Sequence, residues 1–144
     1  MTLSAARRLA RFVVALAPED LPAPVVEKAR LLTLDSLGCC LAAIRYDFGR
    51  AARATAERLG GNPESLVVGG AVRVAAANAV LANATLAHGL DFDDTREDAI
   101  VHTGSVAVTT SLAVGEATGA ASETRREPVS EGALECRVFV EVSG

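Results

Sequence analysis

Residues 74–88, VAAANAVLANATLAH, decide the fold class of this 144-residue chain. The stretch consists almost entirely of alanine, valine, leucine and asparagine, a composition that favours a helix buried on most sides. Asn78 and Asn83 must then find hydrogen-bond partners in the interior, because a buried amide without a partner destabilises a fold. The segment therefore predicts a largely buried helix within an all-α domain.

The helical period continues on both sides of this segment. Apolar residues recur at helical spacing in four further stretches, which are residues 3–16, 22–44, 48–59 and 105–118. In the second of them the apolar face runs past Gly38, where we expect a helix that is either interrupted or closely packed. Residues 65–69 are of β type and predict one short strand or one arm of a hairpin. The sequence thus indicates an all-α fold with one short β segment.

The character of the sequence changes near residue 120. Residues 122–131 are charged and contain Pro128, and residues 134–142 alternate apolar and polar side chains in the period of a strand. We therefore divide the chain into a helical domain, residues 1–120, and a divergent tail, residues 121–144, with a strand-like C-terminal segment.

Composition and charge exclude several classes of function. Half of the residues are hydrophobic but only 3% are aromatic, so the core must be built from alanine, valine and leucine. The net charge of −4 provides no basic surface and argues against nucleic acid as the main partner. No apolar run approaches the roughly 18 residues that a membrane span needs. Cys39, Cys40 and Cys136 lack disulfide or zinc spacing, which predicts free thiols in a cytoplasmic protein.

Chemistry-bearing side chains gather directly after the central helix. Asp91, Asp93, Asp94, Thr95 and His102 bring three carboxylates, a hydroxyl and an imidazole into a dozen residues. If the helix continued, Asp91 and Thr95 would lie at i and i+4 and share one face. His102 precedes an expected helix start, where the helix dipole favours a neutral imidazole that can act as a base.

Other polar residues of this region allow more than one interpretation. Arg96 could hold a substrate carboxylate or remain solvated. Asp93 and Asp94 could support Asp91, and Asp94 is also a candidate for substrate binding. For His88 we expect a hydrogen-bonded interior position.

These residues carry a resemblance to a known family. The string AHGLDFDDT at residues 87–95, followed by IVH at 100–102 and GEATGA at 115–120, resembles the N-terminal part of the MmgE/PrpD family. That family includes 2-methylcitrate dehydratase, cis-aconitate decarboxylase and iminodisuccinate epimerase. The resemblance runs from about residue 5 to residue 120, with its most specific part in the aspartate-rich string.

The resemblance implies an all-helical domain, often homodimeric, that handles small di- and tricarboxylic acids without a metal or an organic cofactor. Asp91, Thr95 and His102 match catalytic positions of the family. Two positions depart from the family pattern: Thr103 follows the histidine where the family usually has proline, and Arg96 follows the Asp-Asp-Thr.

Family members continue for several hundred residues and supply a second histidine and site lysines, whereas Lys28 is the only lysine here. The resemblance therefore implies a cofactor-independent hydro-lyase that is present here as a fragment, a truncated homologue or the product of a shifted reading frame. The sequence does not determine which acid is the substrate. It also does not determine whether the reaction is dehydration, decarboxylation or epimerisation. The alternative is a non-catalytic helical module that dimerises or complements a companion chain.

A second alternative comes from phosphoryl chemistry. The pattern Asp91-x-Asp93-x-Thr95 also fits phosphohydrolases, in which the first aspartate is a nucleophile and the pair binds magnesium. That chemistry places the motif directly after a buried β-strand. Because residues 82–90 read as a helix, we consider this interpretation the weaker one.

Overall fold

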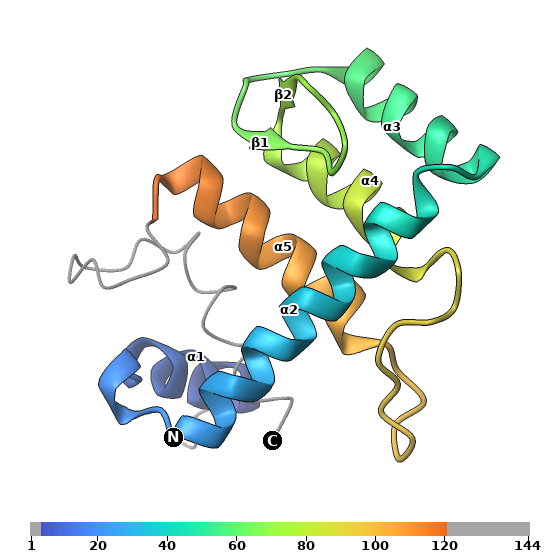
Figure 1. The fold of residues 1–144 in the computed structure, drawn as a ribbon. Coiled ribbons are helices and arrows are strands. Elements are labelled where there is room, and N and C mark those ends of the chain that lie inside the picture. Colours follow the sequence, from blue (N-terminus) through green and yellow to red (C-terminus); the bar gives the residue numbers. More distant parts are fainter. Residues whose placement is uncertain (1–3, 121–144) are drawn as a thin grey trace.

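The computed structural model describes residues 4–120 and confirms the all-α fold class (Figure 1). Five α-helices and one two-stranded hairpin make up this part of the chain. In chain order they are α1 (Ala5–Ala15), a 3-10 turn (Pro18–Asp20), α2 (Ala23–Ala43), α3 (Asp47–Leu59), β1 (Ser65–Leu66), β2 (Arg73–Val74), α4 (Ala76–His88) and α5 (Thr103–Thr118). The expected tail segment and Cys136 lie outside the described residues.

Local sequence explains where several helices begin and end. Pro22 stands at the N-cap of α2, where its missing N–H leaves no helical hydrogen bond unmade. Gly119 ends α5 in the left-handed region at φ 65°, which a glycine adopts without steric penalty. The expected interruption or close packing at Gly38 was wrong. The helix α2 continues through this residue, and nothing lies within 4 Å of a Cβ placed there.

The β segment is one arm of a hairpin, which was one of the two alternatives expected from sequence. Its two strands pair antiparallel, with Ser65 opposite Val74 and Leu66 opposite Arg73. The buried Ser65 hydroxyl donates to the Ala113 carbonyl of α5 at 2.7 Å. This bond ties the hairpin to α5, so the hairpin covers the end of the bundle distant from the α4–α5 connection (Figure 1).

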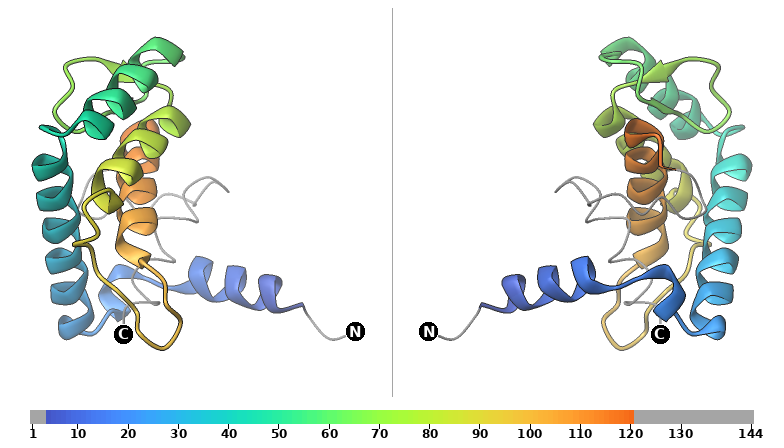
Figure 2. Two further views of the ribbon diagram at one scale, coloured as in Figure 1. Left: turned by 90° about the vertical axis from the view of Figure 1, so that its right-hand side faces the viewer. Right: turned by 90° about the vertical axis from the view of Figure 1, so that its left-hand side faces the viewer.

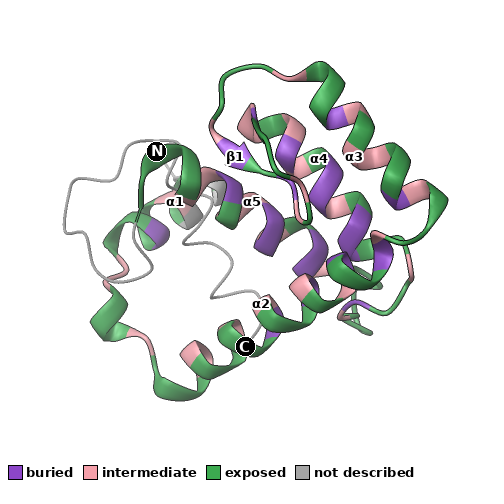
Figure 3. Ribbon diagram, turned by 45° about the horizontal axis from the view of Figure 1, so that its top comes forward, coloured by how far each residue is buried: buried purple, intermediate pink, exposed green. Residues whose placement is uncertain are grey.

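Helix α4 lies at the centre of the bundle, against α2, α3, α5 and both strands. The buried core has small side chains, as the composition predicted: Cys40, Ala43, Ala56, Val67, Val74, Ala79, Ala82, Leu86, Ala87 and Ala113. Figure 3 shows buried positions along the facing sides of α4 and α5. Small side chains allow the two helices to approach closely, which brings the ends of α4 and α5 together.

The interior asparagine of α4 is paired, as its burial requires. The Asn83 amide donates to the Leu66 carbonyl at 3.0 Å, and its Oδ1 accepts from the Val68 N–H at 2.8 Å. Asn78, which is half-buried, donates to the Gly60 carbonyl at 3.1 Å. Both expected partners therefore exist, and Asn83 joins α4 to the hairpin.

The outer face of α2 carries leucines in contact with solvent. Leu31, Leu34 and Leu41 are 53%, 69% and 60% exposed. Helix α1 does not cover them, because it extends away from the bundle at the N-terminal end of α2 (Figure 2). Among the helices of residues 4–120, none has both the length and the apolar character that crossing a membrane would demand.

Candidate functional site

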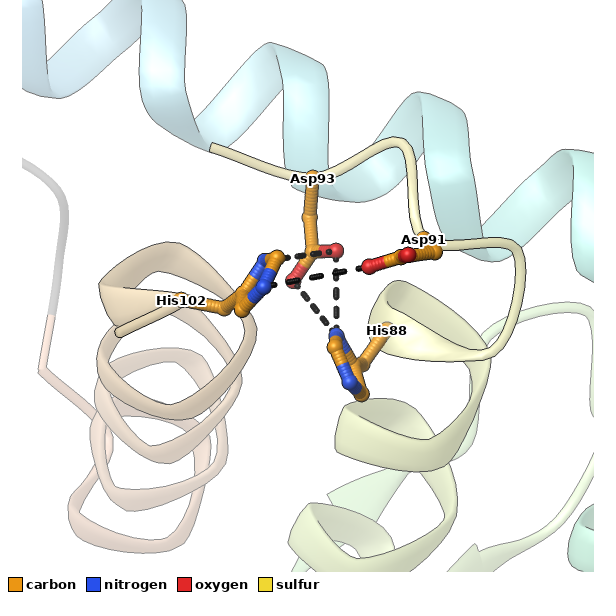
Figure 4. Close-up of side chains that lie close together, drawn as sticks. All are labelled: His88, Asp91, Asp93 and His102. Carbon is orange, nitrogen blue, oxygen red and sulfur yellow. Dashed lines mark hydrogen bonds and ion pairs between the residues drawn. The ribbon is translucent and has the colours of Figure 1, made fainter. Parts of the chain in front are cut away.

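The predicted site residues lie where the C-terminal end of α4 meets the N-terminal end of α5. His88 is the last residue of α4, and His102 is the N-cap residue of α5. The loop of residues 89–101 joins the two helices and carries Asp91 and Asp93. Figure 4 shows the four side chains turned toward one another.

Asp93 is the hub of this cluster. Its side chain has no exposed surface, and its carboxylate lies between two imidazoles. Nδ1 of His88 lies 3.1 Å from Oδ1 and 3.2 Å from Oδ2 of Asp93, and Nδ1 of His102 lies 3.3 Å from Oδ1. A buried carboxylate is stable only with partners of this kind, so Asp93 orients both rings.

His102 presents its other nitrogen to a second carboxylate. Its Nε2 lies 3.8 Å from Oδ1 of Asp91, whose side chain is 80% exposed. The backbone at Asp91 has φ 55°, a left-handed conformation that aspartate tolerates better than most residues. The rings of His88 and His102 meet edge to face with centroids 4.6 Å apart. The structure therefore brings Asp91 and His102 together, as the sequence predicted.

Asp94 points to the start of α5. Its Oδ1 accepts a hydrogen bond of 2.7 Å from the backbone N–H of Gly104, in the first turn of that helix. Gly104 is buried here, and a Cβ at this position would overlap the Asp94 carboxylate. Asp94 thus caps α5 and fixes the backbone that carries His102. The Asp94 side chain, which was also a candidate for substrate binding, is thus engaged by the backbone of α5.

The expected helical arrangement of Asp91 and Thr95 was wrong. Helix α4 ends at His88, so the two residues do not share a helix face. Thr95 is exposed in the loop, and no hydrogen bond joins its side chain to the cluster within the described residues. Gly89 still has right-handed helical dihedrals, and the left-handed turn at Asp91 directs the chain away from the helix axis.

Arg96 forms a local ion pair. Its Nε lies 2.9 Å from Oδ1 of Asp98, and its backbone pairs with Val101 across a tight turn. The hydrogen bond from Arg96 lowers the pKa of Asp98, and the same contact raises the pKa of Arg96. Both side chains are largely in solvent, so in this structure Arg96 neutralises Asp98 rather than the carboxylates of the cluster.

The expectation for His88 also needs correction. Instead of an interior position it has a side chain that is 52% exposed, and it contacts Asp93. The sequence signal that could have indicated this contact is the spacing of His88 and Asp93, which are five residues apart across a helix end.

Four donor groups of this cluster could hold a metal ion. One ligand atom each from His88, Asp91, Asp93 and His102 can be chosen so that all lie within 4.8 Å of one another. Nearby thiols are less suitable, because burial raises the pKa of Cys40 to about 11 and its Sγ donates to the Asn83 carbonyl. Burial is also the main cause that raises the pKa of Cys39, with contributions from Asp35 and Asp93.

The sequence of this chain matches one known protein family. The sequence profile of the MmgE/PrpD N-terminal domain matches residues 7–132. The chain belongs to the MmgE/PrpD family. Comparisons with curated proteins and with solved structures gave no match.

The fold also separates this MmgE/PrpD chain from the phosphohydrolase alternative. In that chemistry the first aspartate follows a β-strand, whereas Asp91 follows the helix α4. The two short strands of the described residues precede α4 in the sequence, within residues 65–74. The magnesium phosphohydrolase interpretation was therefore wrong.

Proposed function

We propose that this domain contributes the proton-transfer part of a cofactor-independent lyase that acts on a small di- or tricarboxylic acid. The reaction class that we favour is dehydration, as in 2-methylcitrate dehydratase. The observation that carries the proposal is the imidazole of His102 between the buried Asp93 and the exposed Asp91. Membership of the MmgE/PrpD family adds support.

The proposed chemistry uses both nitrogens of one ring. Asp93 lies 3.3 Å from Nδ1 of His102, while Nε2 lies on the side of the exposed Asp91. In dehydration the imidazole removes a proton from the carbon next to a substrate carboxylate. The electron pair of that C–H bond forms the double bond, and the hydroxyl on the neighbouring carbon leaves as water with a proton from an acid.

The remaining roles follow from exposure. Asp91 is an orienting or acid-base carboxylate, and Thr95 is a hydrogen-bond donor to the substrate. Both side chains are exposed and so reach a bound acid from the loop. Asp94 acts through the start of α5, whereas Arg96 would have to leave Asp98 to bind substrate.

The charge balance indicates that further groups take part. Asp91, Asp93 and Asp94 carry three negative charges, and the two imidazoles supply at most two positive charges. A polycarboxylate needs additional cations, but Arg96 is paired with Asp98 and Lys28 lies on α2. We infer that lysines and a further histidine on a companion chain complete the substrate site, because Lys28, His88 and His102 are the only lysine and histidines of this sequence.

A non-catalytic module is the second candidate function. The exposed leucines of α2 at positions 31, 34 and 41, together with Val106 and Leu112 of α5, favour it. Large apolar side chains that remain exposed are a common feature of contact surfaces. In this case the domain pairs with itself or with a companion chain and has no turnover alone.

The test combines activity with complementation. The purified chain is incubated with 2-methylcitrate, citrate and cis-aconitate, alone and together with a protein that carries the remaining family segments. We expect product only in the combined sample, and we expect His102→Gln to abolish it. Asp47→Asn is the matched control, because this exposed carboxylate pairs with Arg50 on α3 and not with the cluster.

Two results would contradict the proposed lyase activity. One is the absence of turnover for all three acids in the combined sample. The other is turnover by His102→Gln at the parent rate. A stable complex without turnover would leave the module as the function.

A further inference from the structure

We propose that His88, Asp91, Asp93 and His102 form a binding site for a divalent transition-metal ion of the zinc type. The cluster combines two imidazoles with two carboxylates, and the four donor atoms lie within 4.8 Å of one another. Zinc binds to histidine and carboxylate at about 2.0–2.2 Å, which separates neighbouring ligands of a tetrahedral site by roughly 3.4 Å. The two imidazole nitrogens facing Asp93 lie 3.1 and 3.3 Å from its Oδ1, close to that separation.

The electrostatics of Asp93 independently favour a cation. Its carboxylate is completely buried, and its ion-pair partners in residues 4–120 are the two histidines, without a lysine or an arginine. Asp91 adds a second negative charge on the other side of His102. A cation between these groups would compensate charge that neutral imidazoles leave uncompensated.

His102 provides the second sign of a missing partner. Its Nδ1 is buried and faces Asp93 at 3.3 Å, but it makes no hydrogen bond of acceptable geometry. A buried polar atom without a hydrogen bond is uncommon in a folded protein. A metal ion bound between this nitrogen and the Asp93 carboxylate would supply the partner.

The donor set selects the class of metal. Imidazole nitrogen suits zinc, cobalt, nickel and copper, whereas magnesium and calcium prefer an all-oxygen shell. Zinc on Nδ1 of His102 would displace the ring proton to Nε2, so the nitrogen that acts as the base would no longer have a free lone pair. The ion is therefore a competing ligand that inhibits proton transfer. This inhibitory role rests on the proposed function, whereas the binding itself rests only on the geometry.

Binding is measured on the untagged full chain after removal of metal by a chelator. Calorimetry and thermal melting are carried out with zinc chloride and, as a comparison, magnesium chloride. We expect zinc to raise the Tm and magnesium to leave it unchanged. His88→Gln should weaken zinc binding at least about tenfold, while Asp98→Asn should bind as the parent does.

Additional variants separate ligation from folding and from thiol binding. Asp93→Asn should lose zinc binding. Because Asp93 is buried, this substitution also affects folding. The half-exposed His88→Gln is therefore the decisive variant. A Cys39→Ser/Cys40→Ser/Cys136→Ser chain should retain zinc binding. Cobalt should give a spectrum without a thiolate charge-transfer band.

Three outcomes would overturn the site. They are no zinc binding by the parent, parent-like affinity of a folded His88→Gln, and loss of binding in the cysteine-free chain. Because none of these readouts needs turnover, failure of the lyase proposal leaves the binding result unaffected.

Discussion

Replacing Asp94 by alanine tests whether this carboxylate caps α5. The substitution removes the acceptor of the 2.7 Å bond from Gly104 N–H, at the positive end of the helix dipole. A hydrogen bond to a charged group contributes about 1.5–3 kcal/mol, and we expect the free energy of unfolding to fall by that amount. The unfolding entropy of a chain of this length converts this loss into a Tm lower by about 5–10 °C.

The assay is thermal and urea unfolding followed by circular dichroism. Asp94→Asn keeps an acceptor oxygen but loses the charge, so its Tm should lie between those of the parent and Asp94→Ala. Gly104→Ala should also destabilise, because its Cβ would overlap the Asp94 carboxylate. In the double variant this overlap is absent. Its loss of stability should therefore be smaller than the sum of the losses of the two single variants.

The matched control is Asp98→Ala, which breaks an exposed ion pair with Arg96 and should leave the Tm unchanged. An Asp94→Ala chain that unfolds at the temperature of the parent would refute the capping role. Full additivity of the Asp94 and Gly104 substitutions would refute the contact between them.

Three further predictions concern the interior. Asn83→Ala should lower the free energy of unfolding by about 1–3 kcal/mol in urea titrations, because it leaves the Val68 N–H and the Leu66 carbonyl without partners. Leu86→Ala should cost about 2–5 kcal/mol by the same measurement, since Leu86 is fully buried, whereas the exposed Leu81→Ala should change stability by less than about 0.5 kcal/mol. With Cys39 and Cys136 replaced by serine, Cys40 should react with a thiol reagent roughly a hundredfold more slowly at pH 8 when folded than in urea, because burial raises its pKa to about 11. Its contribution to stability should be lost as the pH rises from the ordinary thiol range toward that value, and a reaction rate equal in both states would contradict this prediction.

Helical periodicity was sufficient to predict the helices, because each buries one apolar face and the spacing records that face. The segment of residues 74–88 shows this most clearly, since its composition predicted a buried α4 and hydrogen-bonded asparagines. The sequence could not decide between a single strand and a hairpin arm for the β segment, because two residues in each strand leave too short a pattern.

Two of the four residues in the cluster, Asp91 and His102, were predicted as site residues, whereas the predicted Thr95 and Arg96 are not part of it. Proximity in sequence indicated that Asp91 and His102 would meet, because both lie between two packed helices. Their arrangement depends on a loop with a left-handed residue at position 91, which residue types alone do not specify. The roles of Asp94 and His88 likewise depend on contacts to Gly104 and Asp93 that a helical projection does not contain.

The two imidazoles and the two carboxylates are anchored by different parts of the structure. The rings belong to the ends of α4 and α5, so the packing of these helices sets their 4.6 Å separation. The acids belong to the connecting loop. An insertion or deletion in that loop would therefore shift the acids while the rings kept their places, which makes loop length the simplest route by which natural variation could retune the chemistry of this site.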